Sequence, residues 1–358
     1  MNKPEKTLVV LSPAFPRNES DTVWVPAQQI LVKELKNQFP DLKIVVLSFS
    51  YPYEETEYDW NGIKVFAFDG MKKRKFKRLS LWLTIWKKLK KIKRENNLIG
   101  IFSFWCSECA LVGSWFAKLN GVKHYCWICG QDARKSNKLV KWIRPGSEEL
   151  VAISDFLIDE FYKSHGIKPS HFIPIAIDKK MFPELPAERN IDIIGAGSFS
   201  FQKNYDHFVS MIGALKKQFS DIKAIHCGSG EDENKVKDLR IKLNLENNLS
   251  FLGMMPPIEV LRLMQKSKIL LHPSSYEGFG MVCLEALYAG AHVISFVKPM
   301  KQEIKNWHIV NTREEMVLKA AELLQTPNLS YDRVVLFSVD DSAKKLMQLF
   351  NKNIHDAK

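Results

Sequence analysis

Apolar and polar residues alternate along the chain in blocks that predict strands and helices in turn. In the first half, short apolar runs predict strands at Leu8–Leu11, Leu42–Phe49, Ile63–Phe68, Ile99–Phe104, Lys123–Ile128 and Leu150–Ile153. Apolar residues at helical spacing between these runs predict helices at Val25–Phe39, Leu79–Lys93 and Ala110–Leu119. Strands that alternate with helices predict a parallel sheet with helices on both faces.

The same alternation starts again at Ile191–Ile194 and reaches its clearest form in the stretch Leu270–Phe296. There a short apolar run is broken by Pro273, and Met281–Ala289 has helical spacing. Gly290 stands where a helix C-cap glycine would, and another apolar run follows it. This pattern predicts a strand, a loop, a helix and a second strand, and we expect the chain to be organised around this unit.

Two carboxylates mark this unit, because Glu277 lies in the predicted loop and Glu285 inside the predicted helix. Glycines let a ligand approach the backbone closely, and a helix N-terminus presents free N–H groups to an anion. Carboxylates beside such a pocket are suited to accept hydrogen bonds from sugar hydroxyls. The alternative is an ordinary helix with a capping acid at Glu277 and a surface-facing Glu285. The residue types alone leave both interpretations open.

The residues of this unit resemble a known signature. Pro273-Ser274-x-x-Glu277-Gly278-Phe279-Gly280, with Glu285-Ala286 and Gly290 after it, is similar to the E-x7-E motif of the family 4 glycosyltransferases. The resemblance implies that Glu277 contacts the donor sugar near the reacting centre and that Glu285 binds the ribose hydroxyls of the nucleotide. It also implies that the backbone of Gly278, Phe279 and Gly280 lies against the sugar and phosphate.

A second motif, Gly197-Ser198-Phe199 with Lys203-Asn204, resembles the phosphate loop of the same family. The resemblance implies that Lys203 neutralises the donor diphosphate, with Gly197 and Ser198 beside it, although many members carry Arg where this chain has Ser198. The alternative for Lys203 is a solvated residue at a helix start. A nicotinamide-binding fingerprint is weakly supported, because position 200, where G-x-G-x-x-G requires a third glycine, is Ser.

Two stretches of the first half depart from the family pattern. The loop Pro13–Asn18 has no glycine where the family has a double glycine, although Arg17 there could supply charge. Cys129-Gly130-Gln131-Asp132 stands where the family tends to have His-Gly-x-Asp, so the role of that His is not transferred. Asp132 stays a candidate catalytic residue near the acceptor, and an ordinary turn-forming Asp is the alternative.

The resemblance covers most of the chain and implies the α/β GT-B fold, in which two Rossmann-like domains face each other across a cleft. The expected parts are an acceptor-side domain at 1–183, a nucleotide-sugar domain at 184–336, and a C-terminal helix within 337–358 that crosses back to the first domain. The implied activity is transfer of a sugar, with retention, from a nucleotide sugar to a glycan or lipid-linked saccharide in surface polysaccharide biosynthesis. Two alternatives stay open: a GT-B nucleotide-sugar epimerase, and a non-catalytic scaffold that binds sugar nucleotides.

The composition is that of a soluble globular protein, with 46% hydrophobic and 26% charged residues. No apolar run approaches the length of about 20 residues that spans a membrane, and Thr7–Leu11 is too short for a signal-peptide core. We therefore expect a cytoplasmic protein that is at most attached to a membrane surface. We also expect no metal or other cofactor, because no Asp-x-Asp pair lies in a plausible donor loop.

The net charge of +12 is local, because the segment 71–94 contains twelve Lys or Arg and no Asp or Glu. Its first part is a candidate for binding anionic lipid on the inner face of the plasma membrane, with Phe76 and Leu81 reaching the interface. RNA is the competing polyanion, but no nucleic-acid-binding module is recognisable. The basic residues of this candidate surface are Lys72, Lys73, Arg74, Lys75, Lys77 and Arg78.

Four of the six cysteines form two pairs, Cys106-x-x-Cys109 and Cys126-x-x-Cys129. This spacing formally fits a four-cysteine zinc site. The second pair, however, lies in an apolar run that predicts a buried strand, in which positions i and i+3 face opposite ways. We therefore expect ordinary core cysteines, with zinc as the alternative.

Overall fold

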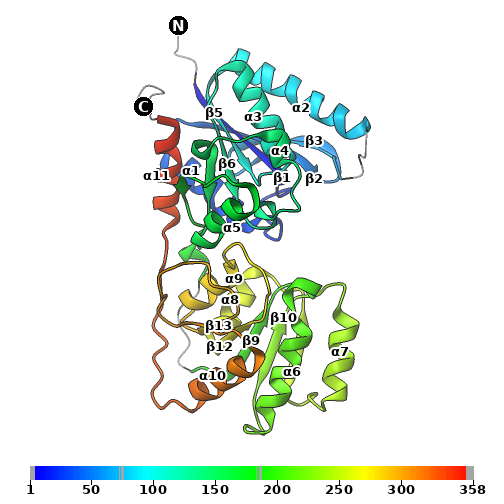
Figure 1. The fold of residues 1–358 in the computed structure, drawn as a ribbon, viewed down its shortest axis with the longest axis vertical. Helices are drawn as coiled ribbons and strands as arrows, with labels where there is room; N and C mark the ends of the chain where they lie inside the picture. The colour runs from blue at the N-terminus through cyan, green and yellow to red at the C-terminus, as the bar shows by residue number, and fades with distance from the viewer. Residues whose placement is uncertain (1–4, 72, 74–75, 183, 185–187, 352–358) are drawn as a thin grey trace. The chain divides into compact units, whose positions relative to one another are not determined.

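The computed structural model describes residues 5–71, 73, 76–182, 184 and 188–351 of the chain (Figure 1). Within these residues the chain separates into two compact units, which divide between Ala176 and Ile177. The chain re-enters the first unit at Phe337. The sequence placed the first boundary at 183, seven residues later than the contacts place it, because Pro183 and Pro186 suggested a linker there.

The first unit is built on a sheet with the strand order β3-β4-β2-β1-β5-β6-β7-β8. Each neighbouring pair is parallel except β3 and β4, which are antiparallel. The order reverses direction between β1 and β5. Its strands are β1 (Lys6–Ala14), β2 (Lys43–Tyr51), β3 (Glu55–Trp60), β4 (Ile63–Phe68), β5 (Asn97–Phe104), β6 (His124–Ile128), β7 (Leu150–Ala152) and β8 (His171–Phe172).

Apolar helix faces cover this sheet. The main helices of the first unit are α1 (Pro26–Gln38), α2 (Phe76–Glu95), α3 (Glu108–Asn120), α4 (Val140–Ile143), α5 (Asp155–His165) and α11 (Val339–Asn351). One core joins Leu81, Ile85 and Leu89 of α2 to Val112 and Phe116 of α3 and to the central strands. Leu81 is therefore a core residue, which corrects the expectation that it reaches a membrane interface.

The last helix, α11, belongs to the first unit although the whole second unit precedes it. It packs beside α1. The Ser342 hydroxyl donates to the Pro174 carbonyl at 3.1 Å, and the Phe350 ring meets the edge of Tyr125 at 5.0 Å. The chain therefore returns after 336 to complete the first unit.

The second unit has a fully parallel sheet with the order β11-β10-β9-β12-β13-β14. The order reverses between β9 and β12. The strands are β9 (Ile191–Ala196), β10 (Ala224–Cys227), β11 (Leu249–Gly253), β12 (Ser267–His272), β13 (His292–Ser295) and β14 (Trp307–Ile309). The helices are α6 (Tyr205–Lys216), α7 (Glu233–Lys242), α8 (Pro257–Gln265), α9 (Met281–Tyr288) and α10 (Arg313–Gln325).

The central unit of the sequence, Leu270–Phe296, forms β12, a loop, α9 and β13, as predicted. Gly290 follows α9 with φ +85°, the left-handed conformation that favours glycine after a helix end. The strand β3 was not predicted, because five of its six residues, Glu55–Asp59, are at least partly exposed and three of these are acidic. Such an edge strand lacks the apolar run that marks a buried strand.

Candidate functional site

The candidate site lies at the carboxyl ends of β9 and β12, the two neighbouring strands between which the strand order reverses. In open parallel sheets, the loops that leave such a pair of strands diverge and leave room for a ligand. The loop after β9 carries Gly197, Ser198 and Lys203, and the loop after β12 carries Glu277 and leads into α9. The topology thus brings together the two motifs that the sequence analysis singled out.

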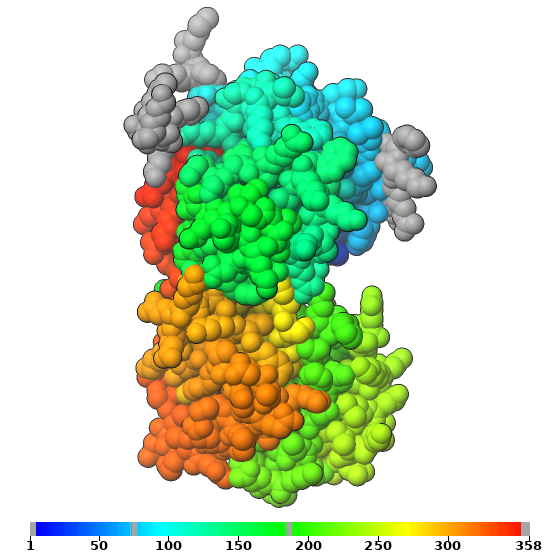
Figure 2. Space-filling model, in the orientation of Figure 1, coloured from blue at the N-terminus to red at the C-terminus, as the bar shows by residue number. Residues whose placement is uncertain are grey.

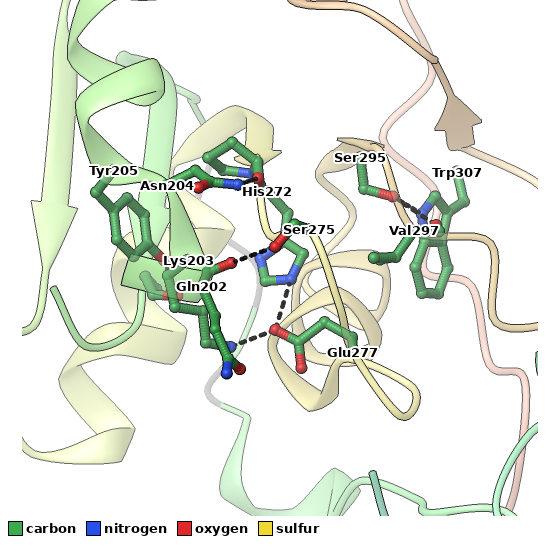
Figure 3. A network of polar contacts seen from close by, with 12 residues as sticks. Gln202, Lys203, Asn204, Tyr205, His272, Ser275, Glu277, Ser295, Val297 and Trp307 are labelled. Atoms are coloured by element: carbon green, nitrogen blue, oxygen red, sulfur yellow. Dashed lines mark hydrogen bonds and ion pairs between the residues drawn. The ribbon is translucent and has the colours of Figure 1, made fainter. Parts of the chain in front are cut away.

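An ion pair joins the two loops, because the Lys203 ammonium donates to Oε1 of Glu277 (Figure 3). The same carboxylate oxygen lies 3.2 Å from Nε2 of His272, a residue at the end of β12 that is only 1% exposed. Burial alone would raise the pKa of Glu277. The hydrogen bond from His272 and the charge of Lys203 outweigh burial and lower the pKa to about 2. Glu277 is therefore an anion at every physiological pH.

Further hydrogen bonds fix the two loops against each other. The Ser275 amide donates to the Gln202 carbonyl at 3.0 Å, and the Asn204 side-chain amide donates to the Pro273 carbonyl at 3.0 Å. Asn204 itself has φ +51° and directly precedes α6. Lys203 is therefore held between a 3₁₀ turn and a helix start, with its ammonium directed at Glu277 (Figure 3).

Gly197 is at a close crossing of two loops. Its amide donates to the Cys227 carbonyl at 2.9 Å, and its φ of +145° is one that other residues rarely adopt. A Cβ on Gly228 would lie 2.0 Å from the Gly197 carbonyl oxygen. The next residue, Ser198, is exposed and lies between these crossings and Lys203. The close approach of the two loops therefore requires glycine at both positions.

Glu285 lies on α9, the helix that begins after Gly278-Phe279-Gly280. Phe279 is buried and its ring lies 6.1 Å from that of Trp307, while Gly280 has φ +91° at the helix start. Burial raises the pKa of Glu285 to about 7. Within the described residues, the structure gives the Glu285 carboxylate no hydrogen-bond or ion-pair partner. A carboxylate in this state is suited to receive hydroxyl donors from a ligand.

The structure places His272 in this site although the sequence analysis did not single it out. The signal for His272 is a polar residue at the end of an apolar run, directly before Pro273. On a fully buried strand such a residue has to find a polar partner, and Glu277 five positions later is that partner.

Asp132 lies in the first unit and holds loops together through backbone amides. Its carboxylate accepts from the amides of Cys106 at 2.8 Å and Gly130 at 2.7 Å, and from Cys129 at 3.2 Å. Burial raises the pKa of Asp132 to about 6, although these hydrogen bonds act in the opposite direction. The contacts explain Asp132 as a brace between the loops after β5 and β6, and its catalytic role stays a prediction.

The predicted membrane-binding segment is described in part, because Lys72, Arg74 and Lys75 lie outside the described residues. Lys73 donates to the Phe68 carbonyl at 2.6 Å, and Lys77 is exposed. Arg78 forms an ion pair with Glu108 at the start of α3 and also donates to the Gly70 carbonyl. Arg78, one of the residues predicted to bind anionic lipid, is therefore neutralised by an acid outside the segment 71–94.

The cysteines are free thiols, and Cys106, Cys109 and Cys126 are buried. Burial raises the pKa of the Cys109, Cys126 and Cys129 thiols well above the usual value. Among the residues that the structure describes, no cluster of His, Cys, Asp or Glu side chains is arranged to hold a metal ion. In the same residues, no helix combines the length and apolar character that crossing a bilayer requires.

Comparisons with known proteins show what this chain is similar to. Residues 176–331 match the family model of glycosyl transferases group 1. An uncharacterized glycosyltransferase of Haemophilus influenzae is 23% identical over 332 residues, 88% of this chain and 91% of that protein. An uncharacterized glycosyltransferase of Methanocaldococcus jannaschii is 26% identical over 274 residues, 74% of this chain and 72% of that protein.

Solved structures show the same architecture. The crystal structure of HepE from Anabaena in complex with UDP and glucose superposes with a TM-score of 0.66 at 16% identity. The match covers 96% of this chain and 95% of that one. The chain therefore has the GT-B fold, with one Rossmann-like sheet in each unit, as the sequence predicted.

Proposed function

We propose that this protein, a glycosyltransferase with the GT-B fold, moves a sugar from a nucleotide-sugar donor to a glycan or lipid-linked saccharide with retention of anomeric configuration. The observation that carries the proposal is the Lys203–Glu277 ion pair at the point where the strand order of the second unit reverses. A cation for a diphosphate and an anion for the reacting sugar are there held side by side. The complex of HepE with UDP and glucose supports a nucleotide-sugar donor.

Lys203 takes the role of binding the leaving diphosphate. The backbone amide of Ser198 and the amino end of α9 add partial positive charge at the same end of the sheet, whereas the Gly197 amide is bonded to the Cys227 carbonyl. These groups are aimed at charge that develops as the sugar–phosphate bond breaks, which is where electrostatic stabilisation accelerates a reaction. Glu285, without a partner among the described residues, receives the ribose hydroxyls of the donor nucleotide.

Glu277 orients the donor sugar and stabilises positive charge at its reacting carbon. Its pKa of about 2 ensures that it acts as an anion and not as a general acid. His272, buried behind it, donates through Nε2 and holds the carboxylate in place, so His272 is a positioning residue. Diphosphate binding to Lys203 would draw the ammonium from Glu277 and free the carboxylate for the sugar.

The reaction as proposed needs no metal, because Lys203 and the helix end supply the positive charge that a divalent ion would otherwise bring. The acceptor would belong to a surface polysaccharide, and Asp132 is the candidate contact on the acceptor side. The enzyme would work in the cytoplasm at the inner face of the plasma membrane. The cluster of basic residues between 71 and 94 supports attachment to anionic lipid there.

The proposal is tested in two steps. A thermal-shift panel of nucleotide sugars first identifies the donor, because a ligand that binds only the folded protein raises its melting temperature. Nucleotide release is then measured with and without glycan acceptors, and the anomeric configuration of the product is read by NMR. Release that depends on acceptor supports transfer. Release without acceptor would instead indicate an epimerase, and binding without release would indicate a scaffold.

A further inference from the structure

Three helices of the first unit, α2, α3 and α4, pack in succession, and we call the exposed side chains on them the α2–α4 face. The Trp86 ring of α2 meets the Phe116 ring of α3 at 5.1 Å, and Lys93 of α2 donates to the Asn120 carbonyl at 2.7 Å. The Trp115 indole N–H of α3 donates to the Trp142 carbonyl of α4 at 3.1 Å. Because α2 and α3 pack into the same core on one side of the sheet, their outer sides point the same way.

Large apolar side chains stand exposed on this face. Leu119 is 77% exposed, Trp142 66%, Leu83 58% and Trp115 41%. Figure 2 shows the cyan atoms of the α2 region beside the teal atoms of α3 on one side of the first unit. Isolated exposed apolar residues are ordinary, but two tryptophans and two leucines on adjoining helices indicate a surface that contacts a partner.

Positive charge predominates around these side chains, and the acids of α2 and α3, Glu95 and Glu108, are each paired with an Arg. From Phe76 to Arg94 there are eight Lys or Arg and no acid, and from Arg134 to Gly146 there are five and no acid. Lys118 is paired with Glu149 at 3.5 Å, but the structure gives Lys87, Lys90, Lys138 and Lys141 no acidic partner within the described residues. The face therefore combines exposed indole and leucine side chains with unneutralised positive charge.

We propose that the α2–α4 face is the membrane-docking surface of this enzyme and that its partner is an anionic lipid surface. Tryptophan is enriched at the boundary between lipid headgroups and hydrocarbon, where an apolar ring and a polar N–H are both accommodated. Lysines around it meet the negative headgroups, and exposed leucines enter the acyl boundary. RNA would use the same charge but gains nothing from Leu83 and Leu119. The inference rests on the proposed membrane attachment. It places the docking surface on the helices α2, α3 and α4 and not on the segment Lys72–Arg78.

The test is sedimentation of the full chain with vesicles of phosphatidylglycerol and phosphatidylcholine, against vesicles of phosphatidylcholine alone. We expect wild type to bind only the anionic vesicles and to detach as salt rises. The triple variant Leu83→Ser/Leu119→Ser/Trp142→Ser should bind at least about tenfold more weakly while the charge is unchanged. All three side chains are exposed, so their loss should leave the melting temperature unchanged.

The matched control is Ile241→Ser/Leu318→Ser, which removes apolar side chains that are 56% and 69% exposed on the second unit. It should bind vesicles as wild type does. In a second readout, brominated lipid should quench the fluorescence of wild type more than that of Trp142→Phe, because Trp142 enters the interface.

Each contrary outcome has a distinct meaning. If wild type does not bind anionic vesicles, the proposed membrane attachment and this inference both fall, while sugar transfer stands. If wild type binds and the triple variant binds equally well, the attachment stands and the α2–α4 face is the wrong surface. Binding of RNA in a gel-shift assay that the triple variant loses would also overturn the lipid assignment.

Discussion

The ammonium of Lys203 and the carboxylate of Glu277 form an ion pair although 74 positions separate them in the sequence. The two residues follow β9 and β12, which are neighbours in the sheet but belong to opposite halves of its strand order. The pair is partly buried, with 26% and 16% of the side chains exposed, so solvent screens it only in part. In the free enzyme, the Lys203 ammonium and the Glu277 carboxylate therefore neutralise each other.

The first prediction concerns Glu277→Gln. The substitution keeps the shape of the side chain but removes the negative charge, so turnover should fall by about 100-fold or more. Binding of the nucleoside diphosphate should persist or become tighter, because Lys203 is no longer engaged by a carboxylate. Steady-state kinetics and calorimetric titration with the nucleoside diphosphate measure the two effects separately.

The control for this variant is His272→Asn, which leaves the charge of Glu277 but removes the ring that holds it. It should lower turnover less than Glu277→Gln does, with nucleotide affinity unchanged. Unchanged turnover in Glu277→Gln would remove Glu277 from the mechanism.

The sequence predicts the strands and helices of the second unit well because the signals that begin and end them are local in the sequence. The stretch from β12 to β13 contains its own apolar runs, breaker residues and helix-end glycine, and each acts within a few positions. The ion pair between Lys203 and Glu277 depends on strand order, which residue spacing does not specify. From the sequence, only the resemblance to a family implies that both residues bind one ligand.

The first unit shows where such prediction stops. Asp132 was a candidate for catalysis because of a motif, whereas its observed partners are the backbone amides of two loops. Cys106 lies far from Asp132 in sequence and comes close only because β5 and β6 are adjacent. Likewise Arg78 and Glu108 are 30 positions apart in the sequence, and only the packing of α2 beside α3 brings them together.

The second prediction is that transfer does not require a divalent metal. Lys203 already supplies positive charge at the diphosphate, and the acidic run Glu231-Asp232-Glu233 lies at the start of α7, where acids stabilise a helix. Turnover in EDTA should stay within about twofold of that in magnesium. Loss of transfer in EDTA that magnesium or manganese restores would overturn the prediction.

Lys203→Gln is the companion variant for this measurement. It should lose affinity for the nucleoside diphosphate, because a neutral amide replaces a charge-assisted hydrogen bond worth about 1.5–3 kcal/mol. The loss should be the same with and without EDTA. A loss that magnesium repairs would show that a metal shares the role of Lys203.

The third prediction concerns the proton on Glu285, whose pKa burial raises to about 7. At pH 7 this carboxyl is about half protonated in the free enzyme. Ribose hydroxyls that donate to the carboxylate favour its charged form and lower the pKa. Donor binding at pH 7 should therefore release up to about half a proton.

Calorimetric titration in buffers of different ionisation enthalpy measures the released proton directly. A nucleotide sugar is the suitable ligand, because its diphosphate diester carries no proton that titrates near neutral pH. Glu285→Gln should release none and bind more weakly. Proton release that is the same in wild type and variant, or affinity within twofold, would show that Glu285 does not receive the ribose.

The last prediction concerns the stability of the second unit and rests on His226 at the end of β10. Its ring is buried, stacks on Phe199 with centroids 4.2 Å apart, and also contacts Tyr205. Both ring nitrogens lack a hydrogen-bond partner among the described residues. Burial lowers the pKa of His226 to about 3, so the folded protein holds this ring neutral.

In the unfolded chain the same ring takes up a proton near its ordinary pKa of about 6.5. Between about pH 6.5 and 3 the unfolded state therefore binds more protons at this residue, and acid favours unfolding by up to about 1.4 kcal/mol per pH unit. Above pH 6.5 the ring is neutral in both states, and its contribution to the free energy of unfolding is constant.

The His226→Leu variant removes this pH-dependent contribution, so the stability of its second unit should fall less steeply as the pH is lowered from 7 to 4. Hydrogen-exchange rates of the β9 and β10 amides, corrected for the intrinsic effect of pH, give the stability of the second unit at each pH and so the slope of stability against pH. His171→Leu, in the first unit, is the matched control and should leave the slope of the second unit unchanged. Equal slopes in wild type and His226→Leu would mean that water or a rearranged loop solvates the protonated His226 ring. The packing of Phe199 and Tyr205 around the ring would then not keep it neutral.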